Sequence, residues 1–127
     1  MTLWQIEAAM LKEIHNVKQD VGSLTKRWFS DNYFDLLIWE SDNGQLHSFQ
    51  LCYDKGNDER AFCWTVEKPV THHKVDEGDG TGVVKGTPVL IPEKSIDGLK
   101  VLKHFIDNYG DLDKKTAQII VKKIYET

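Results

Sequence analysis

Residues 33–53 read YFDLLIWESDNGQLHSFQLCY, two runs rich in aromatic and aliphatic residues on either side of Asp42-Asn43-Gly44. Asn-Gly between two such runs predicts a β-hairpin, because a type I′ turn needs a positive φ at both of its central positions. With that turn, three apolar pairs face each other across the strands: Ile38 with Phe49, Leu36 with Leu51, and Phe34 with Tyr53. Side chains alternate between the two faces of a strand, so these six share one face of the sheet.

Further turns extend the hairpin into an antiparallel meander of about four strands. A turn at residues 54–59 leads into a third strand over residues 60–67, and a turn near Lys68-Pro69 leads into a fourth over residues 70–75. The proline-flanked run at residues 87–91 fits an edge strand. The face of the meander that forms the core is expected to hold Phe34, Leu36, Ile38, Phe49, Leu51, Phe62, Trp64 and Val66.

Amphipathic patterns predict helices at both ends of the chain. Apolar residues recur at spacings of three and four from Leu3 to Val17, through Ile6, Met10 and Ile14, which predicts an N-terminal helix or arm that ends near Gly22. Two stripes near the other end predict a C-terminal helical hairpin: Leu99, Leu102, Phe105, Ile106 and Tyr109, then Ala117, Ile120, Val121 and Ile124. Ser95 is the expected N-cap of the first helix and Gly110 the residue that ends it, and the second helix is expected to follow from Asp113. The sequence therefore predicts a single α+β domain over residues 1–127, with the meander packed on the helical hairpin.

Composition narrows the class of partner. The chain has 127 residues and a net charge of −4, and only Arg27 and Arg60 among its 16 basic residues are arginines. Bidentate contacts to phosphate and guanine depend on arginine, so nucleic acid is not expected as the main partner, although the tract at residues 26–29 alternates basic and aromatic character. No apolar run approaches the ~20 residues of a membrane span and no signal-peptide pattern follows Met1, so we expect a cytoplasmic protein with no membrane partner.

The second face of the meander, opposite the core, carries the candidate binding site. The alternation gives it one charge among hydroxyls, thiols, an amide and aromatic rings: Tyr33, Asp35, Leu37, Trp39, Ser48, Gln50, Cys52, Ala61, Cys63 and Thr65. A solvated face would carry more lysine and glutamate, so either the N-terminal arm covers it or it forms a shallow groove for a small molecule or peptide. In that groove Asp35, Trp39 and Gln50 are the anchors. The remaining candidate ligand-binding residues are Cys52, Cys63 and His72.

A small metal-assisted or thiol-dependent hydrolase is the alternative. It would use His72, Asp76 and Asp35 with Cys52 or Cys63, because imidazole and carboxylate bind zinc and a cysteine needs a neighbouring histidine to form a thiolate at neutral pH. The sequence contains no complete metal-ligand, dinucleotide, phosphate-loop or nucleophile-elbow pattern. We therefore expect no cofactor and favour a non-enzymatic binding or regulatory protein. With so few cysteines, the two thiols are expected to be buried and free.

Several stretches in the middle of the chain carry a resemblance to other proteins. They are Arg27-Trp28-Phe29-Ser30-Asp31, Phe34-Asp35-Leu36, Trp39, residues 49–55, Glu59-Arg60-Ala61, Trp64, residues 72–78 and Thr87-Pro88-Val89-Leu90. Over residues 27–92 the chain resembles a group of small uncharacterised bacterial proteins. The resemblance implies a bacterial origin and a stand-alone domain. No activity is established for that group, so the resemblance assigns no role to any residue.

Overall fold

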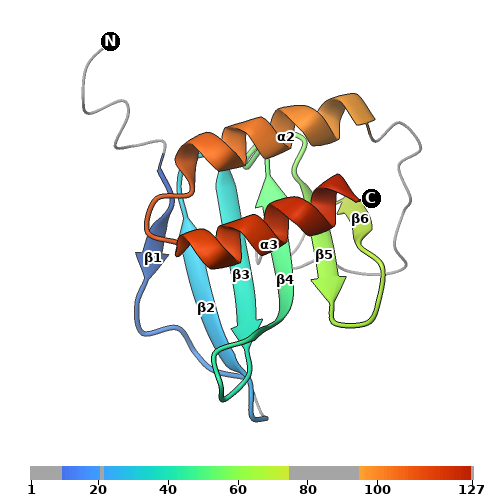
Figure 1. Cartoon of the computed structure of the whole chain (residues 1–127). Coiled ribbons are helices and arrows are strands. Elements are labelled where there is room, and N and C mark those ends of the chain that lie inside the picture. The colour runs from blue at the N-terminus through green and yellow to red at the C-terminus, as the bar shows by residue number, and fades with distance from the viewer. Residues whose placement is uncertain (1–9, 21, 75–94, 127) are drawn as a thin grey trace.

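A computed structural model describes residues 10–20, 22–74 and 95–126 of the chain. Six strands form one antiparallel sheet, in which each strand pairs with the next along the chain: β1 (Lys12–Ile14), β2 (Thr25–Ser30), β3 (Phe34–Glu40), β4 (Leu46–Tyr53), β5 (Arg60–Thr65) and β6 (Thr71–Lys74). Helices α2 (Ser95–Asn108) and α3 (Lys114–Tyr125) lie side by side over one face of this sheet (Figure 1). The predicted α+β class and meander are confirmed, with six strands among the described residues in place of about four; the edge strand predicted at residues 87–91 lies outside them.

Strands β3 and β4 have the predicted register. Phe34 pairs with Tyr53, Leu36 with Leu51, and Ile38 with Phe49. Strands β5 and β6 continue the meander, and their pairing sets Phe62 between Leu51 and His72. The alternation of apolar side chains therefore fixed the pairing across the middle of the sheet, because a slip by one residue would turn every apolar side chain to the wrong face.

The turn between β3 and β4 differs from the predicted type I′ turn. Gly44 has a φ of 82°, but Asn43 does not have a positive φ, so the turn is not the two-residue form. A bulge near the end of β3 compensates for the longer turn: Glu40 pairs with Leu46, and His47 is the extra residue of β4. A three-residue loop closed by a glycine in the left-handed region, with an adjacent bulge, is another common hairpin connection. The register survives because the two changes cancel.

Strand β2 lies on the basic-aromatic tract that precedes the predicted meander. The turn into β3 is made by Asp31, whose Oδ1 accepts hydrogen bonds from the backbone N–H groups of Tyr33 (2.8 Å) and Phe34 (2.6 Å). An aspartate that bonds to the backbone ahead of it favours such a tight turn. The ring of Phe29 is fully buried in the core, whereas Trp28 is half-buried on the opposite face.

The predicted N-terminal helix is wrong over its described part. Residues Lys12–Ile14 form β1, which pairs with β2 at the edge of the sheet, and residues 3–9 lie outside the described residues. Met10 and Ile14 of the predicted stripe are each more than a third exposed, whereas Leu11 is completely buried. Spacings of three and four are compatible with a helix, but here the backbone bonds of an open sheet edge are satisfied by adding a strand.

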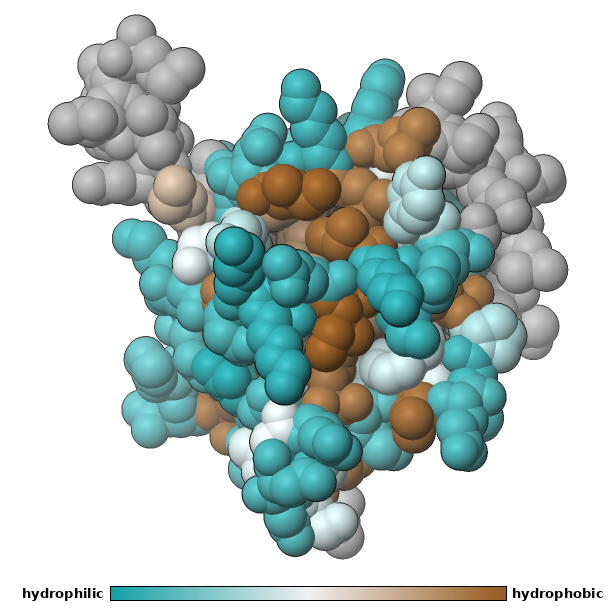
Figure 2. Space-filling view, viewed as in Figure 1, coloured by the Kyte–Doolittle hydropathy of each residue, from teal (hydrophilic) through white to brown (hydrophobic). Residues whose placement is uncertain are grey.

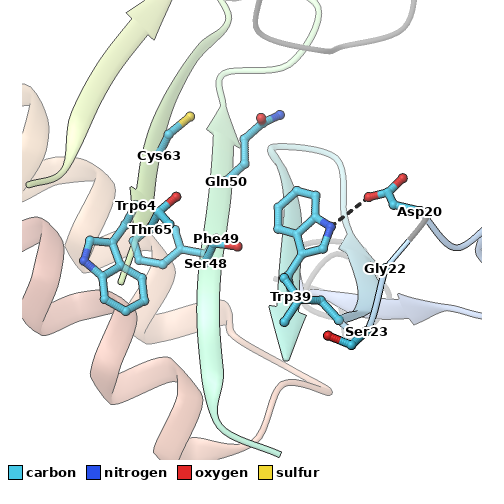
Figure 3. Close-up of a pocket in the computed structure, with 11 residues that line it drawn as sticks. Asp20, Gly22, Ser23, Trp39, Ser48, Phe49, Gln50, Cys63, Trp64 and Thr65 are labelled. Atoms are coloured by element: carbon cyan, nitrogen blue, oxygen red, sulfur yellow. Dashed lines mark hydrogen bonds between the residues drawn. The ribbon is translucent and has the colours of Figure 1, made fainter. Parts of the chain in front are cut away.

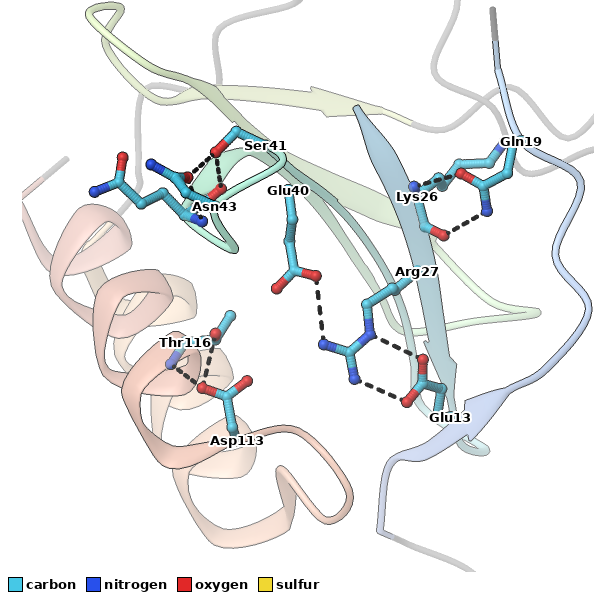
Figure 4. Close-up of polar contacts among 10 residues, drawn as sticks. Glu13, Gln19, Lys26, Arg27, Glu40, Ser41, Asn43, Asp113 and Thr116 are labelled. Atoms are coloured by element: carbon cyan, nitrogen blue, oxygen red, sulfur yellow. Dashed lines mark hydrogen bonds and ion pairs between the residues drawn. The ribbon is translucent and has the colours of Figure 1, made fainter. Parts of the chain in front are cut away.

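Charged side chains fix β1 to the sheet. The guanidinium of Arg27 on β2 donates two hydrogen bonds, of 2.8 and 2.9 Å, to the carboxylate of Glu13, and a nitrogen of the same group lies 3.5 Å from Glu40 (Figure 4). The hydrogen bonds with Arg27 lower the pKa of Glu13. A bidentate arginine pair is a well-oriented surface contact, so it favours the extended form of these residues.

The connection between the two helices is hydrogen-bonded to Leu11, the residue that precedes β1. The Leu11 N–H donates to the Asn108 carbonyl (3.0 Å), and the Asp111 N–H donates to the Leu11 carbonyl (2.9 Å). Gly110 between them has a φ of 52°, as predicted for the residue that ends α2, and a Cβ at this position would overlap the Leu11 carbonyl oxygen. Glycine is therefore required here for both its conformation and its size.

The buried face of α2 is rotated from the predicted stripe. Leu102 and Phe105 are buried as predicted, and so is Val101, which the stripe omitted. Leu99 and Ile106 are 57% and 51% exposed. A helix in the outer of two layers buries only the side that faces the sheet, and the apolar residues of α2 extend beyond that side.

The core lies between the helices and the near face of the sheet. It is formed by Leu11, Phe29, Phe34, Leu36, Ile38, Phe49, Leu51, Tyr53, Phe62, Trp64, Val101, Leu102, Phe105, Leu112, Ala117, Ile120 and Ile124. All of the predicted core face is buried except Val66, which is 44% exposed because β5 ends at Thr65. Tyr33 also differs from its prediction, since its ring stacks on His104 of α2 and lies on the helix side. Helix α3 follows from Asp113 as predicted, and Asp113 is its N-cap, with a side chain that accepts from the Thr116 N–H.

Candidate functional site

The second face of the sheet, which the helices do not cover, contains Asp35 in a network of hydrogen bonds. Its Oδ1 accepts from Trp28 Nε1 (3.0 Å), Ser30 Oγ (2.7 Å) and Lys55 Nζ (3.3 Å). Lys55 also donates to the Asp31 carbonyl at 2.9 Å. The carboxylate therefore links β2, β3 and the turn between β4 and β5. This arrangement is one that stabilises the fold, and Asp35 does not line the groove described below.

Trp39 is held on the same face by a residue from the connection between β1 and β2. Its Nε1 donates to Asp20 Oδ2 at 2.9 Å, and Lys26 Nζ donates to Asp20 Oδ1 at 3.1 Å. These two hydrogen bonds lower the pKa of Asp20. The side-chain amide of Gln19 bonds to both backbone groups of Lys26, at 2.8 Å and 3.0 Å, and so holds this connection against β2 (Figure 4). The hydrogen bond from Nε1 therefore orients the half-buried indole without any ligand.

A groove of about 550 Å³ opens beside this indole. We name it the Trp39 groove, and it is lined by Asp20, Gly22, Ser23, Leu24, Trp39, Ser48, Phe49, Gln50, Cys63, Trp64 and Thr65. Figure 3 shows Trp39, Gln50 and Cys63 projecting from three successive strands. Among the described residues that line it, Asp20 is the only charged one, and its two oxygens already bond to Trp39 and Lys26. The groove thus offers an aromatic ring with neutral donors and acceptors.

The described part of the N-terminal arm does not cover this face as a helix. Residues 10–20 add β1 at the sheet edge and reach the rim of the Trp39 groove only with Asp20. Trp39, Gln50 and Thr65 each stay partly exposed. Of the candidate ligand-binding residues, Trp39, Gln50 and Cys63 are brought together in the groove.

Neither thiol forms a disulfide with another described residue, and burial keeps both protonated at neutral pH. Cys52 is 2% exposed, and burial raises its pKa to about 12, against a hydrogen bond from Gln50 Nε2 at 3.5 Å that acts in the opposite direction. Burial likewise raises the pKa of Cys63 to about 11. A reactive cysteine needs a lowered pKa, so neither thiol has the environment of a nucleophile.

His72 lies on the face opposite to the Trp39 groove. Its ring is buried, stacks on Phe62 with 4.4 Å between ring centroids, and shares a 2.7 Å hydrogen bond between its Nε2 and the Tyr53 hydroxyl. The pairing of His72 with Phe62 places it in the core, so it does not approach Cys63. The histidine on the second face is His73, which bonds to Thr71 at 2.6 Å and whose pKa burial lowers.

The proposed metal ligands are not gathered at one place. Asp76 lies outside the described residues, and within the described part of the chain no three histidine, cysteine or acidic side chains are close enough to hold a metal ion. His72 and Asp35 point to opposite faces of the sheet, since Asp35 bonds to Trp28 on the second face and His72 stacks in the core.

Sequence reasoning did not identify the residues that complete the groove from outside the meander. Asp20, Ser23 and Leu24 come from the connection that leads into β2, which was interpreted as the end of a helix. The only local signal for this connection is Gly22, whose φ of 127° few other residues adopt.

Comparison of the chain with protein-family models, with curated proteins and with solved structures finds no match in any of the three. Over residues 10–20, 22–74 and 95–126, neither helix has the length and apolar character needed to cross a membrane. The fold and the groove themselves therefore carry the functional argument.

Proposed function

We propose that this chain is a non-enzymatic binding or regulatory protein of the bacterial cytosol, and that it takes a small neutral molecule or a peptide into the Trp39 groove. The observation that carries the proposal is the indole of Trp39, which is oriented by Asp20 and remains partly exposed at the groove. Ligand sites combine aromatic surface with a few oriented polar groups, and this groove has both. The bacterial and cytosolic parts of the proposal rest on the sequence alone.

The character of the lining indicates a neutral ligand. Ser48, Gln50 and Thr65 supply hydroxyl and amide groups, and the carboxylate of Asp20 is already paired. A flat, partly apolar compound that stacks on Trp39 and bonds to the Gln50 amide would match these groups. The hydrolase alternative gains no support, because its residues are divided between the two faces and burial keeps the thiols protonated.

The experiment is an NMR titration of the labelled chain with sugars, nucleosides and short neutral peptides. We expect one class of compound to shift the Trp39 indole N–H and the Gln50 side-chain amide. Gln50→Ala should weaken that binding about fivefold to tenfold, since it removes a hydrogen-bonding group.

Two matched substitutions separate loss of the site from loss of the fold. Asp35→Asn disturbs the neighbouring hydrogen-bond network but not the groove lining, so it should lower stability and leave binding unchanged. Leu37→Ala shortens a side chain on the same strand as Trp39. Because Leu37 does not line the groove, this variant should also leave binding unchanged. Failure of every class of compound to shift the groove signals would contradict the proposal, as would binding that Gln50→Ala leaves intact.

A further inference from the structure

A second groove lies on the outer surface of the helical layer. Its volume is about 600 Å³, and it is lined by Phe105, Ile106, Tyr109, Lys114, Ala117, Gln118, Val121, Lys122 and Tyr125. We name it the helix groove. Figure 2 shows a strip of apolar surface between the two helices, with hydrophilic residues on both sides. Ile106 and Tyr125 are 51% and 70% exposed, so the packing of α2 on α3 leaves both side chains largely uncovered.

The charged residues that line this groove are all lysines. Helix α3 contains the lysine pairs Lys114-Lys115 and Lys122-Lys123 and no acidic residue between Lys114 and Tyr125. Lys114 and Lys122 line the groove itself, near its two ends along α3. The whole chain has a net charge of −4, so the positive charge of α3 is opposite in sign to the net charge of the molecule. Electrostatic complementarity therefore favours an acidic occupant.

The shape of the site favours a helix as that occupant. Antiparallel helices α2 and α3 present a hollow between them, and a third amphipathic helix can place apolar side chains at spacings of three and four into such a hollow. A second copy of this chain is disfavoured, because a twofold contact would set the lysines of one α3 against those of the other. A bilayer surface is flat and would not fill the hollow.

We propose that the helix groove binds an acidic amphipathic helix of a partner protein. The apolar side of that helix lies against Ile106, Val121 and Tyr125, and its glutamate or aspartate residues pair with Lys114 and Lys122. The site is separate from the Trp39 groove, since the helices and that groove lie on opposite faces of the sheet. The proposal therefore extends the proposed function without depending on it.

The test uses the full chain and a synthetic acidic peptide of about 18 residues, a length at which helix formation becomes feasible, with leucines at spacings of three and four and glutamates beside them. A peptide of the same pattern with lysine in place of glutamate is the comparison. We expect saturable binding of the acidic peptide, weakened by added salt, with NMR shifts at Ile106 and Val121 and no change at Gln50.

Two substitutions at exposed positions test the contacts. Ile106→Asp places a charge in the apolar strip, and the double change Lys114→Glu with Lys122→Glu reverses the charge. Each should weaken binding about tenfold or more, because the first change buries an unpaired charge and the second sets like charges against each other. The matched controls are Leu99→Asp, at an equally exposed leucine of α2, and Lys103→Glu with Lys115→Glu, which do not line the groove. Both controls should bind as the unchanged chain does.

The other occupants give distinct results. No shift with the acidic peptide at low salt, or equal binding of the lysine peptide, overturns the proposal. Shifts at the same residues with vesicles of equal parts phosphatidylcholine and phosphatidylglycerol, with dodecanoate, or on raising the protein concentration overturn it when they occur without peptide binding. These results would assign the groove to a membrane, a small amphiphile or a second copy respectively.

Discussion

The two faces of this sheet are built from the same strands with different chemistry. On the helix side, Leu36 and its neighbours are buried and belong to the hydrophobic core. On the second face, one residue further along β3, Leu37 is half-buried beside a network in which Asp35 accepts three hydrogen bonds. The helix side therefore provides most of the stability, and the second face keeps its charges paired and its neutral groups available.

This difference explains why the second face has few charges although its buried apolar cluster is limited to Cys52 and Ala61, with Cys63 packed against them. The carboxylates of Asp35 and Asp20 accept hydrogen bonds from side chains of the same face. Gln50 and the ring of Trp39 remain at the surface of the groove. Both carboxylates, the exposed one of Asp20 and the partly buried one of Asp35, therefore find hydrogen-bond donors within the protein. The remaining neutral groups are those on which the proposed ligand would depend.

The largest effect is expected from the core side of β3. Leu36→Ala should lower the free energy of unfolding by about 3 kcal/mol, because it leaves a cavity in a closely packed core. Leu37→Ala, the same change one residue away on the other face, should cost about 1 kcal/mol. Urea unfolding of both variants measures the difference. Equal losses at the two positions would mean that the faces contribute alike, contrary to the comparison.

A smaller effect tests how the helical layer is attached to the edge of the sheet. Gly110→Ala should lower the free energy of unfolding by about 2–3 kcal/mol, because a left-handed φ and an overlap with the Leu11 carbonyl both oppose the new methyl group. Gly44 also has a positive φ, but a Cβ there meets no atom, so Gly44→Ala should cost only about 1 kcal/mol. Thermal unfolding compares them, and equal costs would mean that the contact with Leu11 is not needed.

The smallest effect is a pH dependence at the turn between β2 and β3. Burial raises the pKa of Asp31 above its ordinary value of 3.8, although the N–H groups of Phe34 and Tyr33 act in the opposite direction. Its Oδ2 is buried and meets no hydrogen-bond donor among the described residues. Because the pKa of Asp31 is higher in the folded than in the unfolded chain, its protonated carboxyl group stabilises the fold. This contribution is complete below pH 3.8 and is lost as the pH rises through the pKa of the folded state.

The substitution Asp31→Asn removes the titrating group and keeps an acceptor oxygen for the turn. The variant should be more stable than the unchanged chain at pH 7, by about 1 kcal/mol or less, and the gain should vanish in acid. Asp113→Asn is the control of opposite sign: despite burial, hydrogen bonds from Thr116 hold the pKa of Asp113 low, so its contribution is lost as the pH falls. A pH-independent effect of Asp31→Asn would contradict this assignment.

The predictable part of the fold is the part in which local signals agree. In β3, β4 and β5 the alternation of apolar residues is strong, and a register shift would expose the whole set, so the pairing followed from the sequence. Strand β1 and most of β2 did not, because they carry charged residues whose partners are distant in the chain. Glu13 and Arg27 are the example: in the sequence each is indistinguishable from an ordinary surface charge, and only the pairing of β1 with β2 brings them into contact.

The candidate site divides in the same way. The shared face of Trp39, Gln50 and Cys63 follows from the parity of three paired strands, and all three line the groove. His72 was included although its parity relative to the third strand was open, and its pairing with Phe62 places it in the core. Asp20 was missed because the connection that carries it has no periodic pattern.

The sequence by itself determined the α+β class, the register of the central strands and which side chains of β3, β4 and β5 share each face. These depend on the two-residue period of a strand and on burial of apolar area, which are local properties. Only the tertiary structure decided the partners of Asp35, the orientation of Trp39 by Asp20, and the contact of Gly110 with Leu11. Those contacts join different strands and connections, and no local pattern encodes which hydrogen-bond donor a carboxylate will meet across them.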